Sequence, residues 1–251
     1  MRQLSLLLVF VLYISSVADI NGQEKKEQLW YCIEETVKTE KRSEYIELVK
    51  EIVELCKEEQ FNYKFYTWSH NPLIFQYWIP VSDYSELDSI NKSYENLYKI
   101  WGEEKVIAFR NAIEHSKDFT MIERKDLEYV PKDPNYCRNE IAYTRWIELY
   151  LKNGYLNKFE KAIKRFNEIR KANNVGNFLM YGIGGIGYES TCVIWSMPDI
   201  SIQALYDRDF GERFEEDQTK LVNITRPLMR KPAKHYNMYY LKTLSYSPSD
   251  H

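Results

Sequence analysis

The sequence predicts an α+β protein made of two consecutive units that share one order of elements, β-α-β-β-α-β. Three observations support this prediction. The 251 residues are enough for two small domains. The chain also resembles itself after a shift of 114 to 117 positions. Glycine and proline are scarce, 9 and 8 residues, so regular elements rather than linkers fill the chain.

The internal repeat keeps both residue type and spacing. Ile33-Glu34 is matched by Ile147-Glu148, 114 positions later, and the apolar face of the following helix keeps this shift. At the far end of each unit, the stretch from Phe119 to Pro131 is matched by the stretch from Tyr236 to Pro248, 117 positions later. We interpret the repeat as a tandem duplication with a short insertion.

Each unit reads in the same order along the chain. A first strand is followed by an amphipathic helix, two strands, a helical stretch and a last strand. In the first unit we expect these elements at Leu29–Thr36, Ser43–Glu59, Lys64–Ser69, Leu73–Pro80, Tyr84–Ser116 and Phe119–Leu127. In the second unit we expect them at Ile141–Leu151, Lys158–Ala172, Asn177–Tyr181, Thr191–Met197, Ile202–Arg230 and Tyr236–Leu244.

This order of elements is the ferredoxin-like order. The predicted domains are residues 28–133 and 138–249, with the joint near Pro131–Pro134. Apolar and aromatic residues occupy both faces of several strands, so both faces of each sheet should be covered. We therefore predict that the two units pack sheet to sheet as an intramolecular pseudo-dimer, monomeric in itself and able to associate further.

The first 22 residues predict a signal peptide rather than part of the fold. Arg2 precedes an apolar run from Leu4 to Val17, which ends in the small residues Ser16-Val17-Ala18. The run is shorter than the ~20 residues that span a bilayer, so no stable membrane insertion is expected. We predict an exported protein, periplasmic or extracellular. In such a compartment Cys32, Cys56, Cys137 and Cys192 allow between zero and two disulfides.

Charge and motifs exclude several function classes. Lys plus Arg number 34 against 37 Asp plus Glu, so no basic field indicates a nucleic-acid partner. No spacing of His, Cys or acidic residues is typical of a metal site, and none is predicted. The first strands of the two units carry three carboxylates, Glu34, Glu35 and Glu148. We favour solvent-facing positions for these residues. The alternative interpretation is a paired acid and base that faces a polar cavity.

The duplicated ferredoxin-like order resembles the dimeric α/β-barrel superfamily in a fused, tandem form, over nearly the whole mature chain. The resemblance implies enzymes that include haem-dependent proteins and cofactor-independent monooxygenases. Such enzymes use a histidine, or Asn, Trp and His together. Trp68, His70 and Asn71 supply these residue types in one turn, so His70 is the candidate catalytic residue or haem ligand, with ordinary turn chemistry as the alternative.

Aromatic residues predict a second kind of site. They crowd the hairpin of the first unit, and both core packing and a pocket for a flat or apolar ligand explain them. The glycine-rich stretch from Gly182 to Gly187 follows a predicted strand and precedes another, so we interpret it as a connection rather than a dinucleotide site. Its glycines would let a ligand approach the backbone. The candidate ligand-binding residues are Tyr66, Tyr77, Trp78, Gly184, Gly185 and Trp195.

Three functions remain open at this point. The favoured function is an exported small-molecule-binding protein with an aromatic-lined pocket and a small apolar or aromatic ligand. The first alternative is a haem-dependent or cofactor-independent monooxygenase-like enzyme that acts through His70. The second alternative is a structural or interaction module without a pocket.

Overall fold

The structure is a computed structural model that describes residues 27–130, 142–172, 179–199 and 212–248. The predicted signal peptide, Cys137 and the exact domain boundaries lie outside these residues. Side chains are described except for residues 195–199 and 212–218.

The first half of the chain forms four strands and three helices. Two 3-10 turns follow the last strands of the two halves, at Lys125–Leu127 and Lys242–Leu244. The first half consists of β1 (Glu27–Val37), α2 (Arg42–Glu58), β2 (Tyr66–Asn71), β3 (Ile74–Val81), α3 (Glu86–Trp101), α4 (Glu103–Ala112) and β4 (Ile113–Arg124). The second half contains β5 (Tyr143–Leu149), α5 (Leu156–Ala172), β6 (Leu179–Gly184), β7 (Cys192–Asp199), α7 (Glu212–Thr225) and β8 (Lys234–Tyr240).

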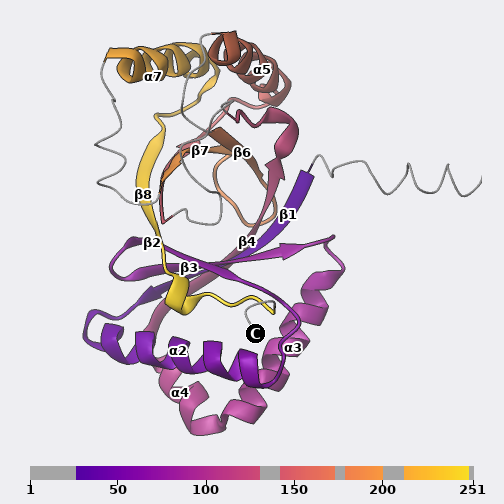
Figure 1. The fold of residues 1–251 in the computed structure, drawn as a ribbon, viewed down its shortest axis with the longest axis vertical. Coiled ribbons are helices and arrows are strands. Elements are labelled where there is room, and N and C mark those ends of the chain that lie inside the picture. Colours follow the sequence, from indigo (N-terminus) through magenta and orange to yellow (C-terminus); the bar gives the residue numbers. More distant parts are fainter. Residues whose placement is uncertain (1–26, 131–141, 173–178, 200–211, 249–251) are drawn as a thin grey trace, which may run out of the picture.

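All the strands join in one closed antiparallel barrel with the order β1-β3-β2-β8-β5-β7-β6-β4. The two halves meet where β2 pairs with β8 and where β4 pairs with β6. The helices α2, α3 and α4 cover the barrel on one side, and α5 and α7 cover it on the opposite side (Figure 1). The predicted α+β class is confirmed, and the sheet edges are joined by hydrogen bonds into one barrel.

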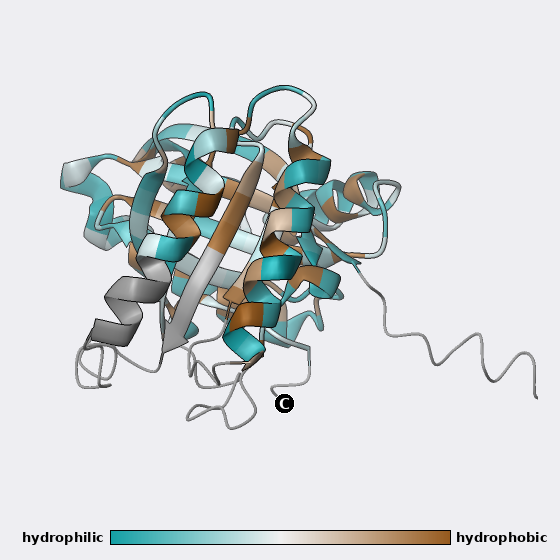
Figure 2. Ribbon diagram, turned by 90° about the horizontal axis from the view of Figure 1, so that it is seen from above, coloured by the Kyte–Doolittle hydropathy of each residue, from teal (hydrophilic) through white to brown (hydrophobic). Residues whose placement is uncertain are grey.

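Hydrophobic residues on both faces of the strands follow from this architecture. The inward faces fill the barrel, and the outward faces pack under the helices. Figure 2, seen down onto α5 and α7, shows hydrophobic residues both on these helices and on the strands beneath them. The fully buried core inside the barrel consists of Cys32, Trp78, Phe119, Met121, Trp146, Val193 and Met238. A separate core lies under the helices of each half.

Several predicted boundaries around the last strands are wrong. The helical stretch predicted to Ser116 ends at Ala112, and β4 begins at Ile113, because these residues extend the pairing with β1. This helical stretch is divided into α3 and α4 at Gly102, whose φ of +100° favours glycine. The ends of the predicted last strands are not extended, since both form 3-10 turns.

Two further findings concern the wider chain. Cys32, Cys56 and Cys192 are free, buried thiols, so no disulfide forms among the described cysteines. Within the described residues, no helix combines the length and the apolar character needed to cross a membrane.

Candidate functional site

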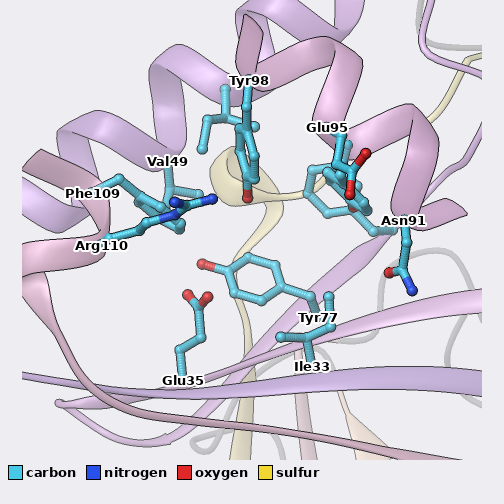
Figure 3. A pocket seen from close by; sticks show the side chains of 12 residues that line it. Ile33, Glu35, Val49, Tyr77, Asn91, Glu95, Tyr98, Phe109 and Arg110 are labelled. Carbon is cyan, nitrogen blue, oxygen red and sulfur yellow. The ribbon is translucent and has the colours of Figure 1, made fainter. Parts of the chain in front are cut away.

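A cavity of about 370 Å³ lies in the first half, between the outer face of the sheet and the helices that cover it (Figure 3). Strands β1 and β3 form its floor, and α2, α3 and α4 contribute the walls. Its lining is mainly aliphatic and aromatic, with a few polar groups. The lining residues are Ile33, Glu35, Val49, Ile52, Phe65, Tyr77, Asn91, Tyr94, Glu95, Tyr98, Phe109 and Arg110.

The alternation of β1 places Glu35 in this cavity. Ile33 and Glu35 point toward the helices, whereas Glu34 between them points into the barrel. The Glu35 side chain is only 7% exposed. Burial raises the pKa of its carboxyl group from 4.5 to about 7, although a hydrogen bond from Tyr45 acts in the opposite direction. Near neutral pH this group therefore both accepts and donates protons.

Two tyrosines fix the Glu35 carboxyl group. Tyr45, in the first turn of α2, donates its hydroxyl hydrogen to Glu35 Oε2, and the Tyr77 hydroxyl lies 2.5 Å from that of Tyr45. The Tyr45 ring packs on Phe75 and Phe109, with centroid distances of 5.0 and 5.5 Å. Burial raises the pKa of both tyrosines, so their hydroxyls remain protonated. The aromatic packing thus positions a hydrogen-bonded acid at the cavity wall.

The interpretation of Glu34, Glu35 and Glu148 as solvent-facing is wrong. Glu35 lies under the helices, and the other two carboxylates point toward the barrel interior. Glu34 accepts hydrogen bonds from Gln76 at 2.6 Å and pairs with Lys117 at 2.9 Å. Glu148 accepts hydrogen bonds from Tyr150 at 2.6 Å and Tyr188 at 2.7 Å. A barrel whose outer face is covered by helices leaves few solvent-facing strand positions, so the solvent-facing interpretation fails for these three residues.

The candidate catalytic residues of the hairpin do not reach the cavity. Trp68 packs inside the barrel, and the His70 ring lies 4.8 Å from the ring of Tyr236, a residue of the barrel interior. Burial lowers the pKa of His70, with Glu34 acting in the opposite direction. Asn71 is exposed, and its Oδ1 accepts a hydrogen bond from the backbone N of Leu73 at 3.0 Å, which is ordinary turn chemistry.

The candidate ligand-binding residues are divided between several places. Tyr77 lines the cavity, whereas Tyr66 and Trp78 pack inside the barrel. The backbone of Trp195 in β7 pairs with that of Trp146 in β5, and the side chain of Trp195 is not among the side chains that the structure describes.

The glycines Gly184 and Gly185 have a structural role. A Cβ atom on Gly185 would lie 2.3 Å from Thr120 Oγ1, and one on Gly184 would lie 2.3 Å from the Ser190 carbonyl oxygen. The backbone N of Gly185 donates to the Thr120 carbonyl at 2.8 Å. These glycines therefore allow β4 itself to approach the connection closely.

Sequence reasoning missed Glu35, Tyr45 and Arg110 as site residues. One signal was available for Glu35: the outward positions of β1 read Tyr31, Ile33, Glu35 and Val37, so a single carboxylate interrupts an apolar face. Such an interruption under a helix indicates a partnered or functional acid.

A haem group fits these residues poorly. The side chains that line the cavity include no histidine, cysteine or methionine, and His70 lies on the opposite face of the sheet. Burial raises the pKa of the lining tyrosines Tyr77, Tyr94 and Tyr98, which disfavours the phenolate form that binds haem iron. Within the described part of the chain, no group of three or more His, Cys, Asp and Glu residues is arranged to hold a metal ion.

The fold resembles solved structures at low sequence identity. An anthrone oxidase-like protein gives a TM-score of 0.57 at 14% identity, covering 90% of this chain and 95% of its own. A candidate monooxygenase from Lactobacillus acidophilus NCFM gives 0.52 at 12% identity, covering 89% and 97%. A candidate monooxygenase from Fusobacterium nucleatum gives 0.50 at 14% identity, covering 87% and 94%.

The α+β barrel of this chain is therefore similar in fold to dimeric α/β-barrel proteins. No protein-family model matches the sequence, and no curated protein is similar to it. The resemblance therefore concerns the fold.

Proposed function

We propose that this chain binds a small, largely apolar molecule in the first-half cavity and exchanges a proton with it through Glu35. One observation carries the proposal: a carboxyl group with a pKa of about 7 lies, 7% exposed, in the wall of a 370 Å³ cavity. An acid whose pKa is near ambient pH is an effective general base and general acid. Strongly shifted groups inside clefts are typical of functional sites. The cavity favours this function over that of a module without a pocket.

The reaction that we propose is oxygenation of an activated methylene group by dioxygen. The names of three solved structures with the same fold, two candidate monooxygenases and an anthrone oxidase-like protein, favour this reaction. Glu35 removes a proton from the substrate, and the resulting carbanion reduces O₂. Overall, CH₂ and O₂ give C=O and H₂O: two C–H bonds break, one oxygen atom enters the carbonyl group and the other leaves as water.

The surrounding residues favour this proton transfer. Tyr45 holds the carboxyl group in one orientation, and Tyr77 supports Tyr45. The apolar walls formed by Ile33, Phe65 and Phe109 accommodate an aromatic body and exclude water from the anion that forms.

Anthrone, which has an acidic methylene group, is the probe that tests the proposal. We expect the purified protein to bind anthrone and to consume one O₂ per molecule oxidised. We expect Glu35→Gln to bind with similar affinity and to oxidise anthrone at least about 100-fold more slowly, because the base is lost. Glu95→Gln is the matched control, since it neutralises another carboxylate in the same lining.

The outcomes separate binding from chemistry. Oxidation by Glu35→Gln at the rate of the unmodified protein would overturn the role of Glu35. Binding of anthrone without oxygen consumption would restrict the proposal to ligand binding. Binding of anthrone is measured by the quenching of tryptophan and tyrosine fluorescence. If the fluorescence is not quenched, the proposed class of ligand is wrong.

The proposal also includes the organisation and location of the protein. We propose that the two halves are a tandem pseudo-dimer, supported by the internal repeat and by the strand order of the barrel, in which each half contributes four consecutive strands in a matching order. Export is proposed from residues 1–22 alone. Cleavage of these residues, checked by mass spectrometry of the secreted protein, tests this part separately.

A further inference from the structure

Arg110 is the cationic side chain of the cavity lining. It is carried by α4, one residue after Phe109, and its guanidinium group points into the cavity beside Tyr98 (Figure 3). Arg110 is exposed along its length, which places it at the mouth rather than in the floor. In the described residues no carboxylate pairs with it, so its donors are available to a ligand.

The hydroxyl group of Tyr98 adds a second donor at the same side. Tyr98 lies on α3, and its hydroxyl points toward the floor of the cavity (Figure 3). Burial raises the pKa of Tyr98, so the group stays protonated and donates a hydrogen bond. Arginine and a neutral tyrosine hydroxyl on adjacent helices are suited to the oxygen atoms of one anion.

The opposite side of the cavity carries the other charge. Glu95 and Asn91 lie on α3, away from Arg110 (Figure 3). A negative ligand group is therefore repelled at Glu95 and attracted at Arg110, which fixes the orientation of the ligand. Between the two sides the floor is apolar, with Ile33, Ile52 and Phe65.

We propose that Arg110 is the specificity-determining residue of this cavity and selects ligands that carry a single oxyanion, carboxylate or phenolate, on a flat apolar body. The oxyanion lies between Arg110 and Tyr98, and the apolar body covers the floor beside Glu35. This inference rests on the proposed function for the location of the ligand, and it adds the class of ligand.

The test compares two probes of the same shape, 2-naphthoate and the neutral 2-naphthamide. Isothermal titration calorimetry at pH 6 keeps the carboxylate ionised and Glu35 largely neutral. We expect the unmodified protein to bind 2-naphthoate about 10-fold more tightly than 2-naphthamide, as is typical of one charge-assisted contact. Arg110→Gln should bind both probes equally, with its affinity for the amide unchanged within about 2-fold. Arg110→Lys should keep part of the preference.

Lys99→Gln on α3 is the matched control, since it removes an exposed positive charge that does not line the cavity. A 10-fold preference that persists in Arg110→Gln, or its absence in the unmodified protein, would overturn the inference. A loss of the preference in Lys99→Gln would show that the preference depends on the net charge of the protein, and this result would also overturn the inference. Glu35→Gln should keep the preference, so failure of the proposed proton transfer and failure of anion selection give different results.

Discussion

The two halves of the barrel bury opposite kinds of ionisable group beneath their helices. In the first half, β3 pairs with β1 so that Tyr77 lies opposite Ile33 and Phe75 opposite Glu35. In the second half, β7 pairs with β5 in the same pattern, with Ile194 opposite Ile147 and Cys192 opposite Leu149. The positions that hold Glu35 and Tyr77 are thus occupied by Leu149 and Ile194.

The helix residue changes in the same way. Tyr45 of α2 corresponds to Phe159 of α5, 114 positions later, and Phe159 is buried in the apolar core of the second half. Among the described side chains, the second half buries the charged group of Arg170, whose guanidinium carbon lies 4.6 Å from the centroid of the Tyr129 ring. Burial lowers the pKa of Arg170 to about 10.

The comparison teaches that the fold does not require a buried carboxyl group at this position. At the positions that match Glu35, Tyr77 and Tyr45, the second half has the apolar residues Leu149, Ile194 and Phe159, which carry no charge to desolvate. The first half accepts the cost of desolvation at Glu35 and leaves a cavity beside it. The difference between the halves therefore supports the site that we propose in the first half.

Introduction of a carboxyl group at the matching position of the second half should have the largest effect on the free energy of unfolding. Leu149→Glu places a carboxyl group where no tyrosine hydroxyl corresponds to that of Tyr45, and we expect it to reduce the free energy of unfolding by about 4 kcal/mol. Leu149→Met, which conserves volume, should cost less than about 1.5 kcal/mol. Urea denaturation measures both, and equal costs would contradict the difference drawn between the halves.

The stability of the first half should depend on pH through Glu35. Its pKa is about 7 in the folded protein and near 4.5 when exposed, so the unfolded chain releases the proton first as pH rises. The free energy of unfolding should therefore fall by about 3 kcal/mol between pH 4.5 and 7 on account of this group. The fall should be absent in Glu35→Gln. A pH dependence that is the same in both proteins would assign it to other groups.

The hydrogen bond from Tyr45 to Glu35 gives a further test of the difference between the two halves. Because this bond stabilises the ionised form of Glu35, Tyr45→Phe should raise the pKa of Glu35 above 7. It should also lower the free energy of unfolding by about 1 kcal/mol. Phe159→Tyr, the reciprocal change, is the control. A downward shift of the Glu35 pKa in Tyr45→Phe would show that the bond favours the neutral acid.

His70 should give the smallest effect on the cavity. It lies in the barrel on the opposite face of the sheet, so His70→Ala should change the affinity for 2-naphthoate less than about 2-fold. The same calorimetry measures it. A 10-fold loss of affinity for 2-naphthoate in His70→Ala would indicate that the ligand binds at the hairpin of His70. The distinction between the barrel interior and the helix-covered cavity would then be wrong.

The sequence predicted the order of elements because periodicity and the internal repeat are local signals. The helix Arg42–Glu58 and the strand Glu27–Val37 differ from their predicted boundaries by one or two residues. The beginning of β4 at Ile113 was missed, since its exposed residues are held by pairing with β1. Local patterns do not contain such long-range pairing.

The site was harder to predict than the fold. Of the predicted residues, Tyr77 was placed at the cavity, and Glu35 was interpreted as exposed. The face to which a strand residue points depends on what covers that face. The helices that cover Glu35 are α2, which follows β1 directly, and α3 and α4, which begin at Glu86 and Glu103, so the burial of this residue depends on tertiary structure.

The most direct measurement is the pKa of Glu35 in the folded protein. Carbon NMR of the labelled side-chain carboxyl groups, assigned by comparison with Glu35→Gln, follows each group as pH is changed. We expect one glutamate to titrate near 7 and to shift when 2-naphthoate binds, because both results follow from a buried acid at the ligand cavity. A Glu35 resonance that titrates near 4.5 and does not shift when 2-naphthoate is added would contradict the assignment of Glu35 as the proton-transfer group.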